Sequence, residues 1–185
     1  PLRPWLVARL GPVGFGIAYS ALSLGVLAWL IGAAARAPYV PLWPWAPWQN
    51  HVVLVVMLPV CLILGLAIAR PNPFSFGGAR NDSFEPAHPG IVRLTRHPLL
   101  LALALWAGAH LLANGDLAHA ILFGTFAAFA LVGTRLVDRR RKREMGDAWQ
   151  DCDDARRHGP LLPAPLSWAG AAGRLGAGAA LVDPD

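Results

Sequence analysis

Residues 97–143, HPLLLALALWAGAHLLANGDLAHAILFGTFAAFALVGTRLVDRRRKR, decide the fold. Two apolar runs, residues 97–113 and 117–137, are separated only by the turn-forming triplet Asn114-Gly115-Asp116. About twenty apolar residues cross ~30 Å of hydrocarbon as a helix, and lipid offers no partner to unpaired backbone groups. The stretch therefore predicts two antiparallel transmembrane helices joined by a tight turn.

Two further apolar segments, residues 14–35 and 51–69, precede this hairpin. The composition agrees with a membrane protein, because 55% of the 185 residues are hydrophobic, 15% are charged and the mean hydropathy is +0.44. Ordinary soluble domains carry roughly 25% charged residues. We therefore predict an all-α polytopic transmembrane helix bundle with about four spans.

The chain divides by composition into two parts. Residues 1–146 contain the four apolar segments and form the predicted transmembrane domain. Residues 147–185 form a C-terminal tail that is first polar and then rich in Ala, Gly and Pro. From residue 160 onward the tail has no charged amphipathic pattern, so we expect it to be loosely ordered.

Basic residues on the predicted loops set the orientation. Four arginines lie between the second and third segments, and five consecutive basic residues, 139–143, follow the fourth. Because cytoplasmic loops carry an excess of Lys and Arg, we place the Pro1 end, the 70–96 loop and the tail in the cytoplasm. Three tryptophans of the first loop then form an aromatic belt at the opposite interface: Trp43, Trp45 and Trp48.

The net charge of +5 does not indicate nucleic-acid binding. The 139–143 block directly follows an apolar helix, which is typical of an anchor at anionic lipid. No aromatic or recognition-helix pattern of the kind that reads nucleic acid accompanies it. The predicted partner of this block is therefore the lipid bilayer.

Histidines are the polar outliers of the apolar segments. His51, His97 and His119 lie near predicted helix ends, where hydrogen bonding at the membrane interface is the simpler reading. His110 lies deeper among apolar neighbours, and for it a ligand role and a structural hydrogen bond are equally open. His97 and His110 are thirteen residues apart, about 20 Å along a helix, so they cannot ligate one iron. His110 and His119 flank the turn on adjacent helices, whose spacing of roughly 8–10 Å is too small to enclose a haem but suits a small ion.

Three stretches resemble the NnrU family, membrane proteins associated with denitrification. They are HPGIVRLTRHPLLLALALWAGAHLLANGDLAHAILFG (residues 88–124), ARLGPVGFGIAYSALSLGVLAWL (8–30) and PNPFSFGG (71–78). The resemblance covers residues 1–146 and implies a role in nitrite and nitric oxide reduction, in a bacterial inner membrane. It also implies an apolar helix with a histidine ahead of residue 1, so we expect such a helix upstream of this sequence.

The NnrU family is in turn similar to the plastid 15-cis-zeta-carotene isomerase, a haem b membrane enzyme. This resemblance implies haem b as the cofactor and His110 as a ligand of its iron. The second ligand is left open between His51 and a residue outside this chain. Arg96 is expected to pair with a haem propionate or a lipid phosphate, and the adjacent His97 is a further cofactor-binding candidate. Ala107 stands where the isomerase has a cysteine implicated in ligand switching, which argues against the same isomerase mechanism.

A different function is implied by the Arg96-His97-Pro98 triplet with Glu144 downstream. This combination resembles isoprenylcysteine carboxyl methyltransferases and related phospholipid N-methyltransferases, in which the cytoplasmic loop and the following helix bind S-adenosylmethionine. Arg96, His97 and Glu144 would then meet the carboxylate and amine of that cofactor. A non-catalytic accessory or assembly protein is the third reading. The bilayer is a partner in each reading, together with other membrane proteins or a small hydrophobic substrate.

Overall fold

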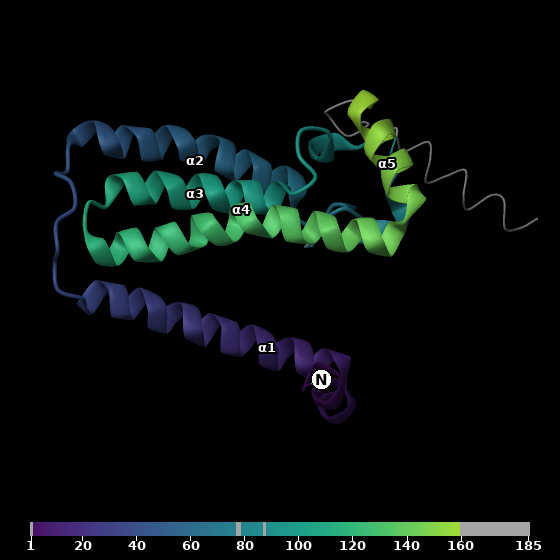
Figure 1. Ribbon diagram of the computed structural model, residues 1–185, viewed down its shortest axis with the longest axis horizontal. Helices are drawn as coiled ribbons and strands as arrows, with labels where there is room; N and C mark the ends of the chain where they lie inside the picture. The colour runs from purple at the N-terminus through teal and green to yellow at the C-terminus, as the bar shows by residue number, and fades with distance from the viewer. Residues whose placement is uncertain (1, 77–78, 87, 160–185) are drawn as a thin grey trace, which may run out of the picture. The chain divides into compact units, whose positions relative to one another are not determined.

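Helices form nearly all of the regular structure in the described part of the chain. The computed structural model describes residues 2–76, 79–86 and 88–159. Its α-helices are α1 (Leu2–Arg36), α2 (Pro47–Ala67), α3 (Pro98–Ala113), α4 (Leu117–Met145) and α5 (Asp147–His158), labelled in Figure 1. Two short 3-10 helices, η1 (Asn81–Ser83) and η2 (Gly90–Arg93), lie in the loop between α2 and α3. The predicted all-α fold is confirmed, whereas the expected looseness of residues 160–185 concerns a segment outside the described residues.

The long helices have the length and composition of membrane spans. Among the described residues, α1, α2 and α4 are long and apolar enough to cross a bilayer, and α3 is a shorter apolar helix of 16 residues. Large apolar side chains point away from the protein on these helices: Leu22 is 67% exposed, Leu54 68% and Phe129 61%. In a soluble protein such surfaces would drive aggregation, but in a bilayer they face lipid. The prediction of about four spans in a helical membrane protein agrees with these elements.

Two helices extend beyond the predicted apolar segments. α1 begins at Leu2 rather than near residue 14, and it bends at Gly11, whose φ of 70° is open to glycine without strain. Pro12 follows the bend, where its missing N–H costs the second half of the helix nothing. α4 continues to Met145 through the basic block, because Arg, Lys and Glu are good helix formers in water.

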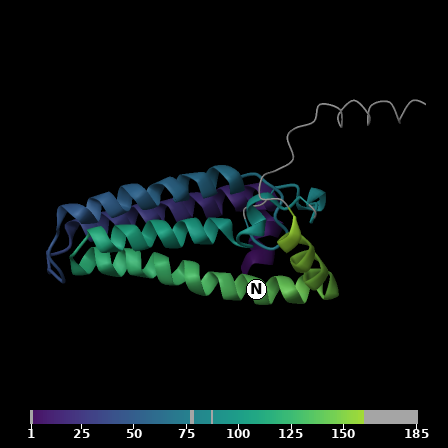
Figure 2. The same cartoon turned by 90° about the horizontal axis from the view of Figure 1, so that it is seen from above.

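The described residues cluster into two compact units, which are treated separately below. The first contains residues up to 60 and residues 103–132, and the second contains residues 61–102 and those from 133 onward. In the first unit, residues 103–113 and 117–132 run side by side in opposite directions in both views (Figure 1 and Figure 2). This arrangement is the helical hairpin that the Asn114-Gly115-Asp116 turn predicted.

The loop between α1 and α2 is fastened to the hairpin turn of the first unit. The backbone N–H groups of Leu42 and Trp43 donate to the carbonyl oxygen of Gly115 at 2.7 and 3.2 Å, and the N–H of Leu117 donates to Val40 at 2.9 Å. The indole N–H of Trp43 donates to the carbonyl oxygen of Leu112 at 3.1 Å. Of the three tryptophans predicted to lie at the membrane interface, Trp43 therefore has a structural role as well, because its indole is hydrogen-bonded to the end of α3.

The second unit has its own apolar core. Phe74 is fully buried there and packs edge-on against the rings of Phe84 and Trp149 at centroid distances of 5.7 and 6.3 Å. Ile91 and Val92 of η2 complete the cluster, and α5 packs on η2 through Trp149. The polar start of the predicted tail therefore forms a helix that covers this core.

Candidate functional site

His110 carries the clearest ligand-like geometry of the first unit. Its ring lies on α3, half-buried, with Nδ1 2.9 Å from the carbonyl oxygen of Trp106. A carbonyl oxygen can only accept a hydrogen bond, so Nδ1 carries the proton and Nε2 keeps its lone pair. No hydrogen bond of Nε2 is formed with any residue that the structure describes. This tautomer is the one in which histidine ligates a metal through Nε2 while the second nitrogen is held by the protein.

Aromatic rings fix the orientation of the His110 ring. Trp106 lies 5.0 Å from it and Phe123 of α4 lies 5.3 Å from it, measured between ring centroids. Phe123 is 8% exposed and also meets Trp106 edge-on at 5.4 Å. The ring of His110 is therefore held from both helices of the hairpin.

A pocket of about 630 Å³ opens beside His110 within the first unit. Its lining combines apolar side chains with amides and one indole: Trp45, Asn50, Val53, Leu54, Ala113 and Asn114. Pockets for small molecules and cofactors are mostly apolar with a few polar groups and measure roughly 300–1,000 Å³. The volume and lining suit a largely apolar small molecule or cofactor that carries some polar groups.

The other histidines of the first unit have different surroundings. His119 places Nδ1 2.7 Å from Oδ2 of Asp116, whose Oδ1 accepts the backbone N–H of His119 at 3.1 Å and so caps α4. Burial opposes the charge of Asp116, but the hydrogen bonds from the backbone and ring of His119 outweigh it and lower the pKa of Asp116. His51 is exposed on α2, with Nδ1 3.1 Å from the carbonyl oxygen of Pro47. His51 is not among the residues that line the His110 pocket.

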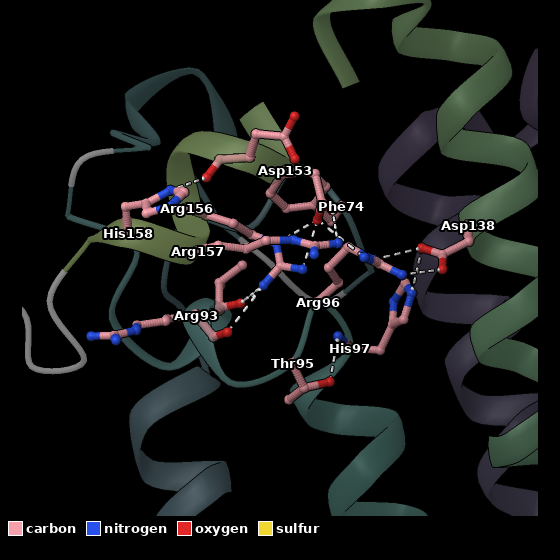
Figure 3. Close-up of polar contacts among 12 residues, drawn as sticks. Phe74, Arg93, Thr95, Arg96, His97, Asp138, Asp153, Arg156, Arg157 and His158 are labelled. Carbon is pink, nitrogen blue, oxygen red and sulfur yellow. Dashed lines mark hydrogen bonds and ion pairs between the residues drawn. The ribbon is translucent and has the colours of Figure 1, made fainter. Parts of the chain in front are cut away.

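The second unit contains a cluster of ion pairs at the start of α3, drawn in Figure 3. Arg96 donates two hydrogen bonds to Asp138 of α4, from Nε to Oδ1 at 3.1 Å and from Nη2 to Oδ2 at 2.7 Å. Its remaining nitrogen, Nη1, donates to Oδ1 of Asp153 of α5 at 3.0 Å. Burial opposes the charge of Arg96, but the two carboxylates outweigh it and raise the pKa of Arg96. Arg96, two residues before α3, thus links α4 and α5 through their carboxylates.

His97 is part of the same cluster and is 4% exposed. Nε2 lies 2.9 Å from Oδ1 of Asp138 and Nδ1 lies 3.0 Å from Oγ of Ser75. A neutral ring satisfies both contacts, with Nε2–H donating to the carboxylate and the Ser75 hydroxyl donating to Nδ1. Burial of the ring lowers the pKa of His97, although the Asp138 carboxylate acts in the opposite direction. The sequence left these two partners of His97 unidentified.

Asp153 and Arg156 fasten α5, the first to Arg96 and the second to the backbone of η2. Its carboxylate accepts bonds from Arg156 (Nε at 2.7 Å), Arg157 (2.8 Å) and Arg96. Burial opposes the charge of Asp153, but these arginines outweigh it and lower the pKa of Asp153. Arg156 donates from Nη1 to the carbonyl oxygens of Val92 and Arg93 at 2.8 and 3.1 Å. Each charged side chain of this cluster thus has an oppositely charged protein partner, as a structural role requires. We call the cluster the ion-pair clamp; its members are Arg96, Asp138, Asp153, Arg156 and Arg157.

Glu144 is engaged away from Arg96 and His97. It accepts a bond from Nε of Arg140 at 2.6 Å and one from Nη1 of Arg141 at 2.9 Å, both within α4. The structure therefore unites Arg96 and His97 but pairs Glu144 with the basic block. His110 and His51 belong to the other unit.

Asp138 and Asp153 are the residues that the sequence did not single out. Asp138 directly precedes the basic block 139–143, so in the sequence it indicates only the charged end of a membrane span. The spacing of Asp153, Arg156 and Arg157 is the i, i+3 and i+4 pattern of helical ion pairs, and this signal could have revealed α5. Within the part of the chain that the structure describes, no three His, Cys, Asp or Glu residues converge in a way that could hold a metal ion.

Comparison with known proteins supports the family. No curated protein and no solved structure gave a significant match to the chain. The family model described as NnrU protein matches residues 1–181, nearly the whole chain. The match extends past the residues that carry the resemblance in the sequence and includes α5 with its clamp. This chain is therefore a member of the NnrU family of proteins.

Proposed function

We propose that this membrane protein binds haem b in the pocket beside His110, and that Nε2 of His110 would hold the iron. The observation that carries the proposal is the place of the His110 ring, which Trp106 and Phe123 hold at the wall of the pocket of about 630 Å³. His51 and His158 make the same Nδ1 contact with the carbonyl oxygen four residues back, so the bond between Nδ1 of His110 and the Trp106 carbonyl oxygen, 2.9 Å long, supports the proposal only together with that place. This bond leaves Nε2 basic and fixes the ring plane, which is how proteins prepare a histidine for iron. When bound, the haem would supply one-electron redox chemistry, in keeping with the denitrification role that the family resemblance implies.

Other residues of the pocket would contact the remainder of the haem. Apolar lining from Val53, Leu54 and Ala113 would exclude water from the porphyrin faces, and Asn50 and Asn114 offer hydrogen bonds to polar edges. The second ligand of the iron would be either His51 or a residue outside this chain. His119 is bonded to Asp116 as part of a helix cap, so its ring has a structural role without a haem.

Contacts in the second unit do not favour the methyltransferase alternative. S-adenosylmethionine would need Arg96, His97 and Glu144 around one site, but Arg96 and His97 bind Asp138 while Glu144 binds Arg140 and Arg141. Moving Arg96 to a cofactor would take the arginine partner from the largely buried carboxylate of Asp138, which is unfavourable. The pairs of Glu144 with Arg140 and Arg141 are exposed and contribute little, so only the contacts of Arg96 and His97 oppose the methyltransferase alternative. Calorimetry of the full chain with S-adenosylmethionine is therefore expected to show no binding.

A haem titration of the full chain, purified in detergent, tests the proposal. We expect a Soret band in wild type and a loss of haem content of at least roughly tenfold in His110→Ala, because an axial ligand contributes more than the outer groups that orient it. His119→Ala is expected to keep most of the haem, and His158→Ala on α5 serves as the matched surface control. Full haem content in His110→Ala, or no Soret band in wild type, would reject the assignment.

A further inference from the structure

A small pocket of about 220 Å³ lies in the second unit at the end of α2. Its wall combines apolar side chains, among them Leu66, Phe84 and Ile91, with the polar side chains of Arg70, Glu85 and His88. Neither the haem proposal nor the ion-pair clamp uses any of them. The volume is below the roughly 300–1,000 Å³ of sites for drug-sized ligands, so the pocket suits a headgroup-sized molecule rather than a porphyrin or a nucleotide cofactor.

The position of the pocket along α2 relates it to the membrane surface. α2 has 21 apolar-rich residues. At 1.5 Å per residue such a helix measures about 31 Å, which matches the hydrocarbon thickness of a bilayer. Leu66 is the penultimate residue of α2 and Arg70 follows three residues after its end at Ala67. A helix of this length that crosses the bilayer ends near the hydrocarbon boundary, so we expect Leu66 at that boundary and Arg70 at the depth of the lipid phosphates.

The polar side of the pocket offers one positive and one negative group. Arg70 is exposed, and its guanidinium forms no ion pair with the residues that the structure describes. Glu85 meets Nδ1 of His88 through Oε2 at 3.3 Å, but the two side chains are 69% and 46% exposed. An ion pair this exposed contributes little, so the carboxylate can exchange His88 for a ligand cation. A guanidinium binds phosphate with two parallel hydrogen bonds.

We propose that this pocket binds the headgroup of a phospholipid that carries a primary ammonium group, as in phosphatidylethanolamine. Arg70 binds the phosphate and Glu85 binds the ammonium, while Leu66, Phe84 and Ile91 contact the glycerol and the upper acyl chain. A headgroup without an ammonium leaves Glu85 close to a phosphate with no cation between them. A quaternary ammonium brings charge but no N–H donor for the carboxylate.

Calorimetric titration of the full chain in detergent with short-chain lipids tests the proposal. Dihexanoyl-phosphatidylethanolamine is compared with the phosphatidylglycerol and phosphatidylcholine of the same chains, and with O-phosphoethanolamine, which has the headgroup alone. We expect the ethanolamine lipid to bind most tightly of the four. Arg70→Ala removes the two bonds to the phosphate; because the arginine is exposed to solvent, the binding of this lipid should weaken about three- to tenfold. Glu85→Gln should abolish the preference for ethanolamine over glycerol.

Matched variants separate a built site from general surface charge. Arg93→Ala removes an exposed arginine of the same loop that does not line the pocket, and it should leave binding unchanged. Equal affinity of wild type for the ethanolamine and glycerol lipids would overturn the proposal without reference to any variant. It would also be overturned if Arg93→Ala weakened binding as much as Arg70→Ala, or if O-phosphoethanolamine bound as tightly as the lipid, which would indicate a soluble ligand.

Discussion

Gly115 and Trp43 lie so close together that a β-carbon on residue 115 would overlap the carbonyl oxygen of Trp43. The carbonyl oxygen of Gly115 meanwhile accepts the N–H of Leu42 at 2.7 Å. Gly115 in the hairpin turn is therefore in close backbone contact with Leu42 and Trp43 of the α1–α2 loop. The turn needs glycine here because of tertiary contact rather than because of its own backbone angles.

Gly115→Ala is expected to destabilise the first unit by about 1–3 kcal/mol, the usual cost of forcing extra atoms into a packed site. The measurement is thermal unfolding in detergent, followed by the fluorescence of the tryptophans. Gly124→Ala on α4 is the matched control, because a β-carbon there meets nothing within 4 Å. A melting temperature of Gly115→Ala equal to that of Gly124→Ala would contradict the tight contact.

Arg96→Lys is expected to lower the stability of the second unit by about 1–3 kcal/mol, between the values for exposed and buried ion pairs. Lysine keeps the charge but cannot bind both oxygens of Asp138 and reach Asp153 as well. Thermal unfolding and the protease sensitivity of α5 are the readouts. Arg93→Lys, on an exposed neighbour, should change neither.

His97 is expected to make stability depend on pH between neutrality and mild acid. Because the pKa of His97 is lowered in the folded protein, the unfolded chain binds its proton first as the pH falls. The contribution of His97 is therefore complete above about pH 6.5 and is lost as the pH falls toward the folded-state pKa, with a slope of at most about 1.4 kcal/mol per pH unit. The groups facing the ring are Asp138, Ser75, Arg96 and Arg156.

Unfolding of wild type and His97→Gln over this pH range isolates the effect. The variant should be less stable at neutral pH, and its stability should change less on acidification. Parallel curves for the two proteins would contradict the prediction, because they would mean that His97 does not titrate in this range.

The orientation inferred from loop charge predicts that Arg80 lies in the cytoplasm and Trp45 on the opposite side. Arg80→Cys and Trp45→Cys, each in a chain with Cys61→Ala and Cys152→Ala, should react with a membrane-impermeant thiol reagent from opposite sides. Both native cysteines are free, so their removal breaks no disulfide. Labelling of both introduced cysteines from the periplasmic side would overturn the topology.

Local sequence patterns determined the helices, the hairpin turn and the family of this protein. A run of apolar residues with one Asn-Gly-Asp interruption has few solutions, because lipid requires each backbone to satisfy its own hydrogen bonds. The positions of α2, α3 and the start of α4 therefore agree with the predicted segments to within a few residues. The helical tail after Gly146 was missed because its apolar face is short and carries only Trp149 and Cys152 as partly or fully buried apolar side chains.

Only the tertiary structure decided which charges and rings meet. Arg96 finds Asp138 across 42 residues and Asp153 across 57, and no spacing rule connects positions so far apart in sequence. The same holds for the His110 pocket, whose walls come from residues 45–54 and 110–114. The sequence singled out His110 by its apolar neighbours, and helix α3 itself sets the proton on Nδ1 through the Trp106 carbonyl oxygen four residues back, but only the tertiary structure brings Phe123 and the pocket wall to the ring. Long-range partners depend on how helices pack, and packing depends on the whole set of side chains rather than on any one motif.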